Sequence, residues 1–115
     1  MVKTIVNSEI EVTLKVIGGK CKPLILYILA NEGEKRFNEL MKTITQISQK
    51  TLTNQLRELE ADNLIKRTCF AQVPPRVEYS ITEKGLTLVP ILEMMCEWGE
   101  KNIDDSFELI NAQCD

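Results

Sequence analysis

Side chains that can donate hydrogen bonds recur along one predicted helix, over residues Gln49–Asp62. Leucines at positions 52, 56 and 59 form an apolar stripe on this helix, because about 3.6 residues complete each turn. The opposite face and its shoulders carry donors for phosphates or base edges: Gln49, Lys50, Thr53, Asn54 and Arg57. Ser48 is a favourable N-cap, and no carboxylate occurs before Glu58, although acids usually favour the first turn of a helix. The pattern favours an anionic partner over an ordinary solvated face.

A second basic group follows on a predicted β-hairpin. The strand-like segments Leu64–Val73 and Arg76–Ile81 flank the pair Pro74-Pro75. The basic residues of the hairpin are Lys66, Arg67 and Arg76. Because Arg76 follows the prolines, we expect it near the hairpin tip, where it would touch a phosphate or enter a minor groove. The alternative is a charged edge strand that discourages aggregation.

Charge is unevenly distributed along the 115 residues, whose net charge is −3. Residues 35–76 contain eight basic and four acidic side chains, a net charge of +4. Residues 77–115 contain nine acidic and two basic side chains, a net charge of −7. An acidic chain is unfavourable for nucleic acid as a whole, but its basic middle segment can still present a positive surface.

Neither catalysis nor metal binding has a recognisable constellation. The chain has no histidine, which removes the commonest general base and the usual zinc patterns, and its five glycines are too sparse for a phosphate-binding loop. Four cysteines show no CxxC spacing: Cys21, Cys69, Cys96 and Cys114. We expect the first three, which lie in apolar stretches, to be buried and reduced. We predict no enzymatic activity, no catalytic residue, no metal and no cofactor.

The sequence also contains no segment that indicates a membrane or an export pathway. No stretch approaches the roughly 20 apolar residues of a membrane span. The first residues lack the apolar run and cleavage site of a secretory signal. We therefore expect a cytoplasmic protein with no membrane partner.

Helices must position the donor residues. Apolar periodicity and end signals predict helices at about Glu9–Ile17, Cys21–Asn31 and Phe37–Ile44 before Gln49–Asp62, and at Glu83–Lys101 and Ile103–Ala112 after the hairpin. A short helix, a tight turn, a second helix and a two-stranded ribbon form a winged helix-turn-helix, a mostly α fold with a small β-hairpin (α+β). This order would place Gln49–Asp62 in the major groove and the wing, Leu64–Ile81, at the adjacent backbone or minor groove. The predicted DNA-binding residues are Arg36, Ser48, Gln49, Lys50, Thr53, Asn54, Arg57 and Arg76.

The predicted helix Glu83–Lys101 has an apolar arc broader than one small core needs. Part of this arc should be buried against a second subunit, unless the last or the first helix folds over it. Pro90 should kink or loosen the helix. The predicted dimer-interface residues are Leu88, Ile91, Met95, Trp98 and Phe107.

Several blocks in order resemble the HxlR-type transcriptional regulators, a branch of the winged-helix proteins related to the MarR group. These blocks are Val16–Lys20, Lys35–Leu40, Ile47–Lys50, Leu52–Glu60, Val73–Ser80 and Cys96–Gly99. The resemblance implies dimeric DNA binding at palindromic sites near promoters, with the N- and C-terminal helices at the dimer interface. We expect repression rather than activation. The sequence leaves a small-molecule effector open, although no residue pattern supports one.

Two departures from the family pattern concern cysteine chemistry. Cys21 follows Gly18-Gly19-Lys20, where the family usually has tryptophan. Ser8-Glu9 stand where many members carry a Cys-Pro pair, and some of those members sense oxidants with that thiol. Serine forms neither a thiolate nor a disulfide, so sensing at that position should be absent.

We interpret residues 1–115 as one winged helix-turn-helix domain. Residues 9–81 would form the DNA-binding core, and residues 1–17 and 83–113 would contribute to dimerisation. The alternative function is a protein-interaction module, in which the same basic surface binds an acidic protein. Binding to duplex DNA that weakens steeply with salt would favour the first function.

Overall fold

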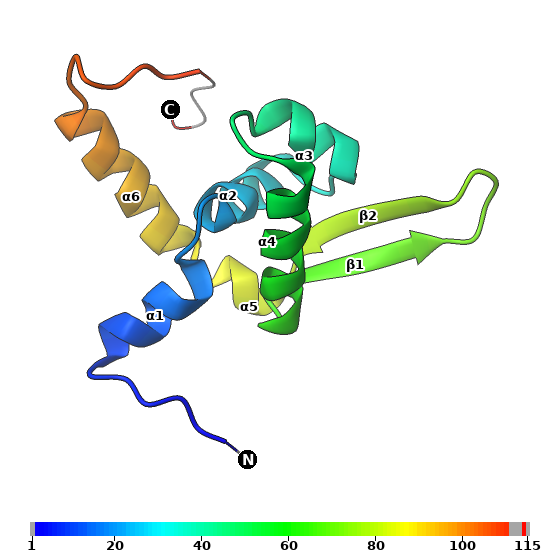
Figure 1. Ribbon diagram of the computed structural model, residues 1–115, viewed down its shortest axis with the longest axis horizontal. Coiled ribbons are helices and arrows are strands. Elements are labelled where there is room, and N and C mark those ends of the chain that lie inside the picture. Colours follow the sequence, from blue (N-terminus) through cyan, green and yellow to red (C-terminus); the bar gives the residue numbers. More distant parts are fainter. Residues whose placement is uncertain (1, 111–113, 115) are drawn as a thin grey trace.

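The computed structural model describes residues 2–110 and 114. The elements in the described part of the chain are α1 (Glu9–Ile17), α2 (Lys22–Glu32), α3 (Phe37–Thr43), α4 (Gln49–Ala61), β1 (Ile65–Phe70), β2 (Arg76–Ile81), α5 (Glu83–Leu86) and α6 (Val89–Asn102) (Figure 1). The order and type of the elements through β2 confirm the mostly α fold with a small hairpin, a winged helix-turn-helix.

The core forms around α2, whose apolar residues point in all directions. Its residues Ile25, Leu26, Ile28 and Leu29 are almost completely buried. The leucines at positions 52, 56 and 59 of α4 are buried against the same cluster, together with Leu40 of α3. The predicted inner stripe of α4 is therefore confirmed, and the opposite face of α4 is left on the surface.

Two local signals fix the ends of α4. The Ser48 hydroxyl accepts a hydrogen bond of 3.0 Å from the backbone N–H of Thr51, as expected of an N-cap. At the other end Asn63 adopts a left-handed conformation with φ of 59°, and the N–H of Leu64 donates to the carbonyl of Leu59 at 3.0 Å. This C-terminal turn directs the chain into β1.

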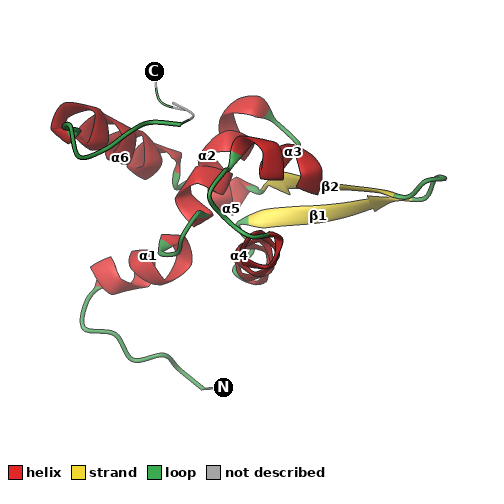
Figure 2. Ribbon diagram, turned by 45° about the horizontal axis from the view of Figure 1, so that its top comes forward, coloured by secondary structure: helices red, strands yellow, loops and turns green. Residues whose placement is uncertain are grey.

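The hairpin is antiparallel, with a register that runs from Ile65 opposite Ile81 to Phe70 opposite Arg76. β1 ends earlier than the predicted strand Leu64–Val73, because the residues before the proline pair form a bend. A bridge between Lys35 and Tyr79 joins β2 to the chain just before α3, through backbone hydrogen bonds of 3.0 and 2.8 Å. The base of the hairpin is thus attached to the helices, and its tip projects away from them (Figure 2).

The single helix predicted over Glu83–Lys101 is wrong, because the chain divides there into α5 and α6. The Thr82 hydroxyl caps α5 by accepting a 3.0 Å hydrogen bond from the N–H of Gly85. Pro90 lies in the first turn of α6, where its missing N–H has no intrahelical partner to lose. Pro90 therefore lies at the start of a new helix rather than at a kink within one.

Gly85 permits the close packing of α5 on the base of the hairpin. It is buried, and a Cβ at this position would overlap the carbonyl oxygen of Leu64 and lie 2.6 Å from Cγ1 of Ile81. From this anchor α6 leaves the body of the molecule at the end opposite the hairpin tip, on the same side as α1 (Figures 1 and 2). None of the described helices is long and apolar enough to cross a membrane.

The predicted helix Ile103–Ala112 is wrong where the structure describes it. Residues 103–110 form turns and irregular chain, and residues 111–112 lie outside the described residues. The side chains of Phe107, Leu109 and Ile110 are exposed. An amphipathic period whose apolar side chains stay exposed gains too little burial to stabilise a short helix.

The expectation for the cysteines is correct only for Cys21, which is buried and free. Cys69 is exposed, because it lies on the outer part of β1 where the hairpin has left the core. Cys96 of α6 is half-buried and forms a disulfide with Cys114 rather than remaining a free thiol. Apolar neighbours in sequence did not indicate burial at these two positions.

Candidate nucleic-acid interface

The outer face of α4 presents the predicted donors. The side chains of Lys50 and Asn54 are exposed on its crest, and Gln49 and Arg57 are also exposed. Among residues 2–110 and 114, neither Lys50 nor Arg57 is held in an ion pair. These cationic side chains are therefore free to approach an anionic partner.

Thr53 and Ser48 have more constrained surroundings than the crest residues. Thr53 is half-buried, and its hydroxyl donates to the carbonyl of Gln49 at 2.9 Å. The Ser48 hydroxyl donates to the Thr51 hydroxyl at 3.0 Å while it also caps the helix. Both hydroxyls keep acceptor capacity, but their donor protons are already engaged.

A polar cleft of about 410 Å³ lies between α4 and the base of the hairpin. Its lining residues are Phe37, Thr53, Leu56, Arg57, Glu60, Arg67 and Tyr79. Arg67 lies opposite Tyr79 in the hairpin register, and hydrogen bonding to Tyr79 together with the nearby Cys69 raises the pKa of the Arg67 guanidinium. Arg57 and Arg67 thus line the same cleft. Sequence analysis noted Arg67 as basic but did not place it in the site. The alternation of side chains along β1 puts Arg67 on the same face of the strand as Ile65, whose side chain is in the core.

Arg76 is the first residue of β2, directly after the proline pair. Its guanidinium lies 4.6 Å from the centre of the Phe70 ring, and Nε is 3.1 Å from a carboxylate oxygen of Glu78. Contacts with Phe70 and Glu78 therefore leave Arg76 half-buried on the wing. Its position in the sequence did not predict these contacts. Arg36 is exposed at the start of α3, where its backbone N–H donates to Glu39 at 2.8 Å.

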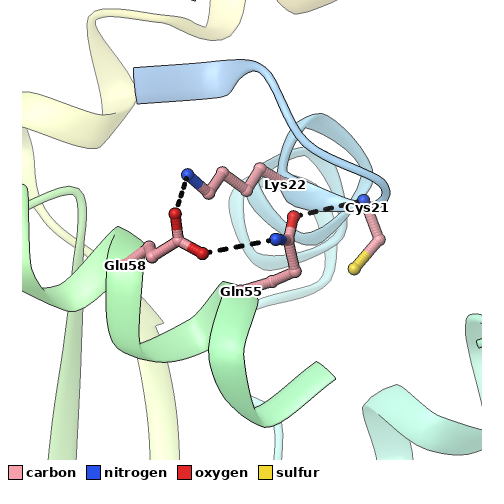
Figure 3. Close-up of polar contacts among 4 residues, drawn as sticks. All are labelled: Cys21, Lys22, Gln55 and Glu58. Atoms are coloured by element: carbon pink, nitrogen blue, oxygen red, sulfur yellow. Dashed lines mark hydrogen bonds and ion pairs between the residues drawn. The ribbon is translucent and has the colours of Figure 1, made fainter. Parts of the chain in front are cut away.

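An ion pair between a buried lysine and an exposed glutamate attaches α4 to the start of α2 (Figure 3). Nζ of Lys22, whose side chain is only 3% exposed, lies 3.1 Å from Oε1 of Glu58. Nε2 of Gln55 donates to the other oxygen of Glu58 at 3.5 Å, and Oε1 of Gln55 accepts from the N–H of Cys21 at the same distance. Sequence analysis identified none of these roles, because the contacts between the start of α2 and α4 join residues 34 and 36 positions apart, and such pairs give no periodic signal.

The residues predicted for the dimer interface lie at the far end of the molecule from the hairpin tip. Ile91, Met95, Trp98 and Phe107 are exposed, and Trp98 is 69% exposed. Leu88 is partly buried against the core, and Leu92 is the buried residue of α6. An apolar crevice of about 570 Å³ lies between α2 and α6, lined in part by Tyr27, Met95, Trp98 and Phe107.

Known proteins are similar to this chain in both sequence and fold. Residues 16–107 match the family described as HxlR-like helix-turn-helix. An uncharacterized HTH-type transcriptional regulator of Halalkalibacterium halodurans is 54% identical over 101 residues, which cover 88% of this chain and 89% of that protein. The redox regulator HypR in its oxidized form is 52% identical with a TM-score of 0.80, over 84% of this chain and 99% of that one. A MarR-family regulator from Enterococcus faecalis is 40% identical with a TM-score of 0.73, over 88% and 91% of the two chains.

Proposed function

Because this chain belongs to the HxlR-like helix-turn-helix family, we propose that it represses transcription as a homodimer bound to palindromic operator DNA. Its family and relatives are DNA-binding transcriptional regulators and not enzymes. Repression, the homodimer and the placement of the residues on DNA are the proposal. A dimer bound to a palindrome near a promoter would exclude the polymerase from the same DNA.

The observation that carries the proposal is the division of α4 into two faces. Its leucines are buried in the core, and its exposed face carries Lys50 and Asn54 with no carboxylate in the first two turns. In the proposed complex α4 lies in the major groove, where Lys50 and Asn54 reach base edges. The residues proposed to contact phosphates are Arg36, Ser48, Gln49, Thr53 and Arg57. Arg76 would contact the adjacent backbone or minor groove from the wing, residues 64–81.

The proposed dimer uses the opposite end of the molecule. Ile10 and Leu14 of α1 are exposed, as are Met95 and Trp98 of α6. Apolar surface of this extent on two helices that lie on the same side of the molecule favours a second copy of the chain as its cover. Residues 1–17 and 83–113 would then dimerise one winged helix-turn-helix domain whose DNA-binding core is residues 9–81. The proposed location of the regulator is the cytoplasm.

Selection of duplexes from a random library, followed by footprinting and transcription in vitro, tests this function. We expect a palindromic footprint, and an affinity that falls steeply with salt because bound phosphates release counterions. Added protein should reduce transcription from a promoter that contains the selected site. A flat salt dependence with no selected sequence would favour the alternative, an acidic protein partner, and increased transcription would overturn repression.

A further inference from the structure

We infer that Lys22 is a positioning residue of the DNA-binding surface: through Glu58 and Gln55 it sets the rotation of α4 relative to the turn that follows α1. This inference rests on the proposed function, because it concerns how the exposed face of α4 is aimed. Lys22 is the one buried charged residue among those that the structure describes. A buried charge is unfavourable unless it is paired, so the Lys22 ammonium requires the Glu58 carboxylate where α4 now holds it.

The contact has two points on one flank of α4. Gln55 and Glu58 are three residues apart, so their side chains lie on neighbouring turns of the same flank. The Glu58 carboxylate lies at Lys22, and the Gln55 amide lies at the backbone N–H of Cys21 (Figure 3). The buried leucines turn α4 toward the core, and two polar contacts one turn apart restrict its rotation further than one contact would. A rotation of α4 would carry Lys50 and Asn54 away from their present direction.

The backbone on the other side of the contact is adapted to Gln55. A Cβ on Gly19 would overlap Oε1 of Gln55 and lie 3.2 Å from the side chain of Lys22. The amide of Gln55 therefore lies directly against the turn of residues 18–21. This turn connects α1 to α2, so the same contact that orients α4 also fixes the point where α1 leaves the body of the molecule.

In a dimer formed through α1 and α6, this connection has a geometric consequence. The direction of α1 would set the relative position of the two subunits, and the rotation of α4 would set where each subunit meets its half-site. Lys22 would thus contribute to the preferred separation of the half-sites without touching DNA. Its 3% exposure leaves it no surface with which to contact a phosphate.

The test replaces both charges, Lys22→Met with Glu58→Met, so that no unpaired charge remains and the net charge is unchanged. The control is Lys101→Gln with Glu97→Gln, an ion pair of the same 3.1 Å separation whose side chains are 71% and 65% exposed on α6, replaced by polar residues so that the apolar dimer face is not enlarged. The probes are duplexes selected by the wild-type protein, versions with the half-sites one base pair closer or further apart, and a scrambled duplex. Affinities are measured across salt concentrations, with circular dichroism and sedimentation for the fold and the dimer.

We expect the variant that carries Lys22→Met and Glu58→Met to lose about tenfold in the ratio of its affinity for the selected duplex to its affinity for the scrambled duplex. The loss of one well-placed base contact would cause a change of this size. Its preference for the original spacing should weaken, its salt slope should stay unchanged, and the control should match the wild type. An unchanged ratio and spacing preference in a folded dimer would overturn the inference. So would a salt slope reduced by about one, which would indicate that Lys22 itself contacts a phosphate.

A second variant keeps the test decisive where the double replacement does not fold. Lys22→Met removes the buried ammonium and leaves Glu58, whose side chain is 56% exposed and can be solvated, so no buried charge is left unpaired and the fold should tolerate the change. The ratio of affinities and the spacing preference are again the measurements, and unchanged values overturn the inference. A wild-type protein that selects no duplex would contradict the proposed function itself, which separates the two failures.

Discussion

At the residue scale, the exposed cations of α4 are predicted to act through charge and position. We expect Lys50→Ala to weaken binding to the selected duplex and to reduce the salt slope by up to about one. The melting temperature should hardly change, because Lys50 is exposed and unpaired among the described residues. Titration of labelled duplex at several salt concentrations measures both quantities. Lys101→Ala, at the other end of the molecule, is the control, and equal affinities for the two variants would contradict the placement of α4.

The buried thiol gives a second prediction at this scale. Burial raises the pKa of the Cys21 thiol, against a smaller opposing effect of Lys20. A pKa raised by folding means that the folded protein holds the proton more tightly than the unfolded chain. The resulting contribution to stability is complete below the unfolded pKa, about 8.5, and is lost as the pH rises through the folded pKa. We therefore expect the wild-type melting temperature to fall more steeply above about pH 8.5 than that of Cys21→Ser. Parallel slopes for the two proteins would show that the thiol is not responsible.

Individual residues also show where reasoning from sequence succeeds. The donors of α4 were predicted because Leu52, Leu56 and Leu59 define a buried face and therefore its opposite. The stacking of Arg76 on Phe70 and the burial of Lys22 were not predicted. Both depend on contacts between segments whose relative placement follows from the whole fold rather than from a local period.

At the element scale, α5 shows how a short helix depends on one small residue. We expect Gly85→Ala to destabilise the protein by about 1–3 kcal/mol, because its Cβ would be forced against the Leu64 carbonyl and the Ile81 side chain. Urea unfolding measures the free energy of unfolding. Gly99→Ala is the control, since a Cβ there meets no atom within 4 Å. A Gly85→Ala protein as stable as the control would contradict the tight packing of α5.

The elements that were predicted well are those whose ends carry their own signals. Ser48 acts as the expected N-cap of α4, and Asn63 ends the helix in a left-handed conformation. The division between α5 and α6 was missed because the apolar pattern continues across it, and Pro90 is compatible with a kink or with a new helix. The C-terminal helix was wrong for the opposite reason, since its period is present but its apolar side chains remain exposed.

At the scale of the whole molecule, the exposed apolar end is predicted to hold the dimer together. We expect Trp98→Glu to shift the protein toward monomers, because a carboxylate in a buried interface is unpaired and desolvated. Sedimentation over a range of concentrations measures the shift, and affinity for the palindrome should fall with it. Glu97→Gln, next to Trp98 but paired with Lys101 at the surface, is the control. A Trp98→Glu protein that remains dimeric would move the interface to other helices.

The bridge between Lys35 and Tyr79 also constrains how the protein meets its target. These backbone hydrogen bonds continue the hairpin into the segment that leads to α3, so the wing and the helix-turn-helix share one piece of hydrogen-bonded backbone. The distance between the exposed face of α4 and the wing is therefore held fixed. A duplex whose groove width does not match this distance must itself deform to be bound. The flexibility of the DNA sequence would then contribute to recognition.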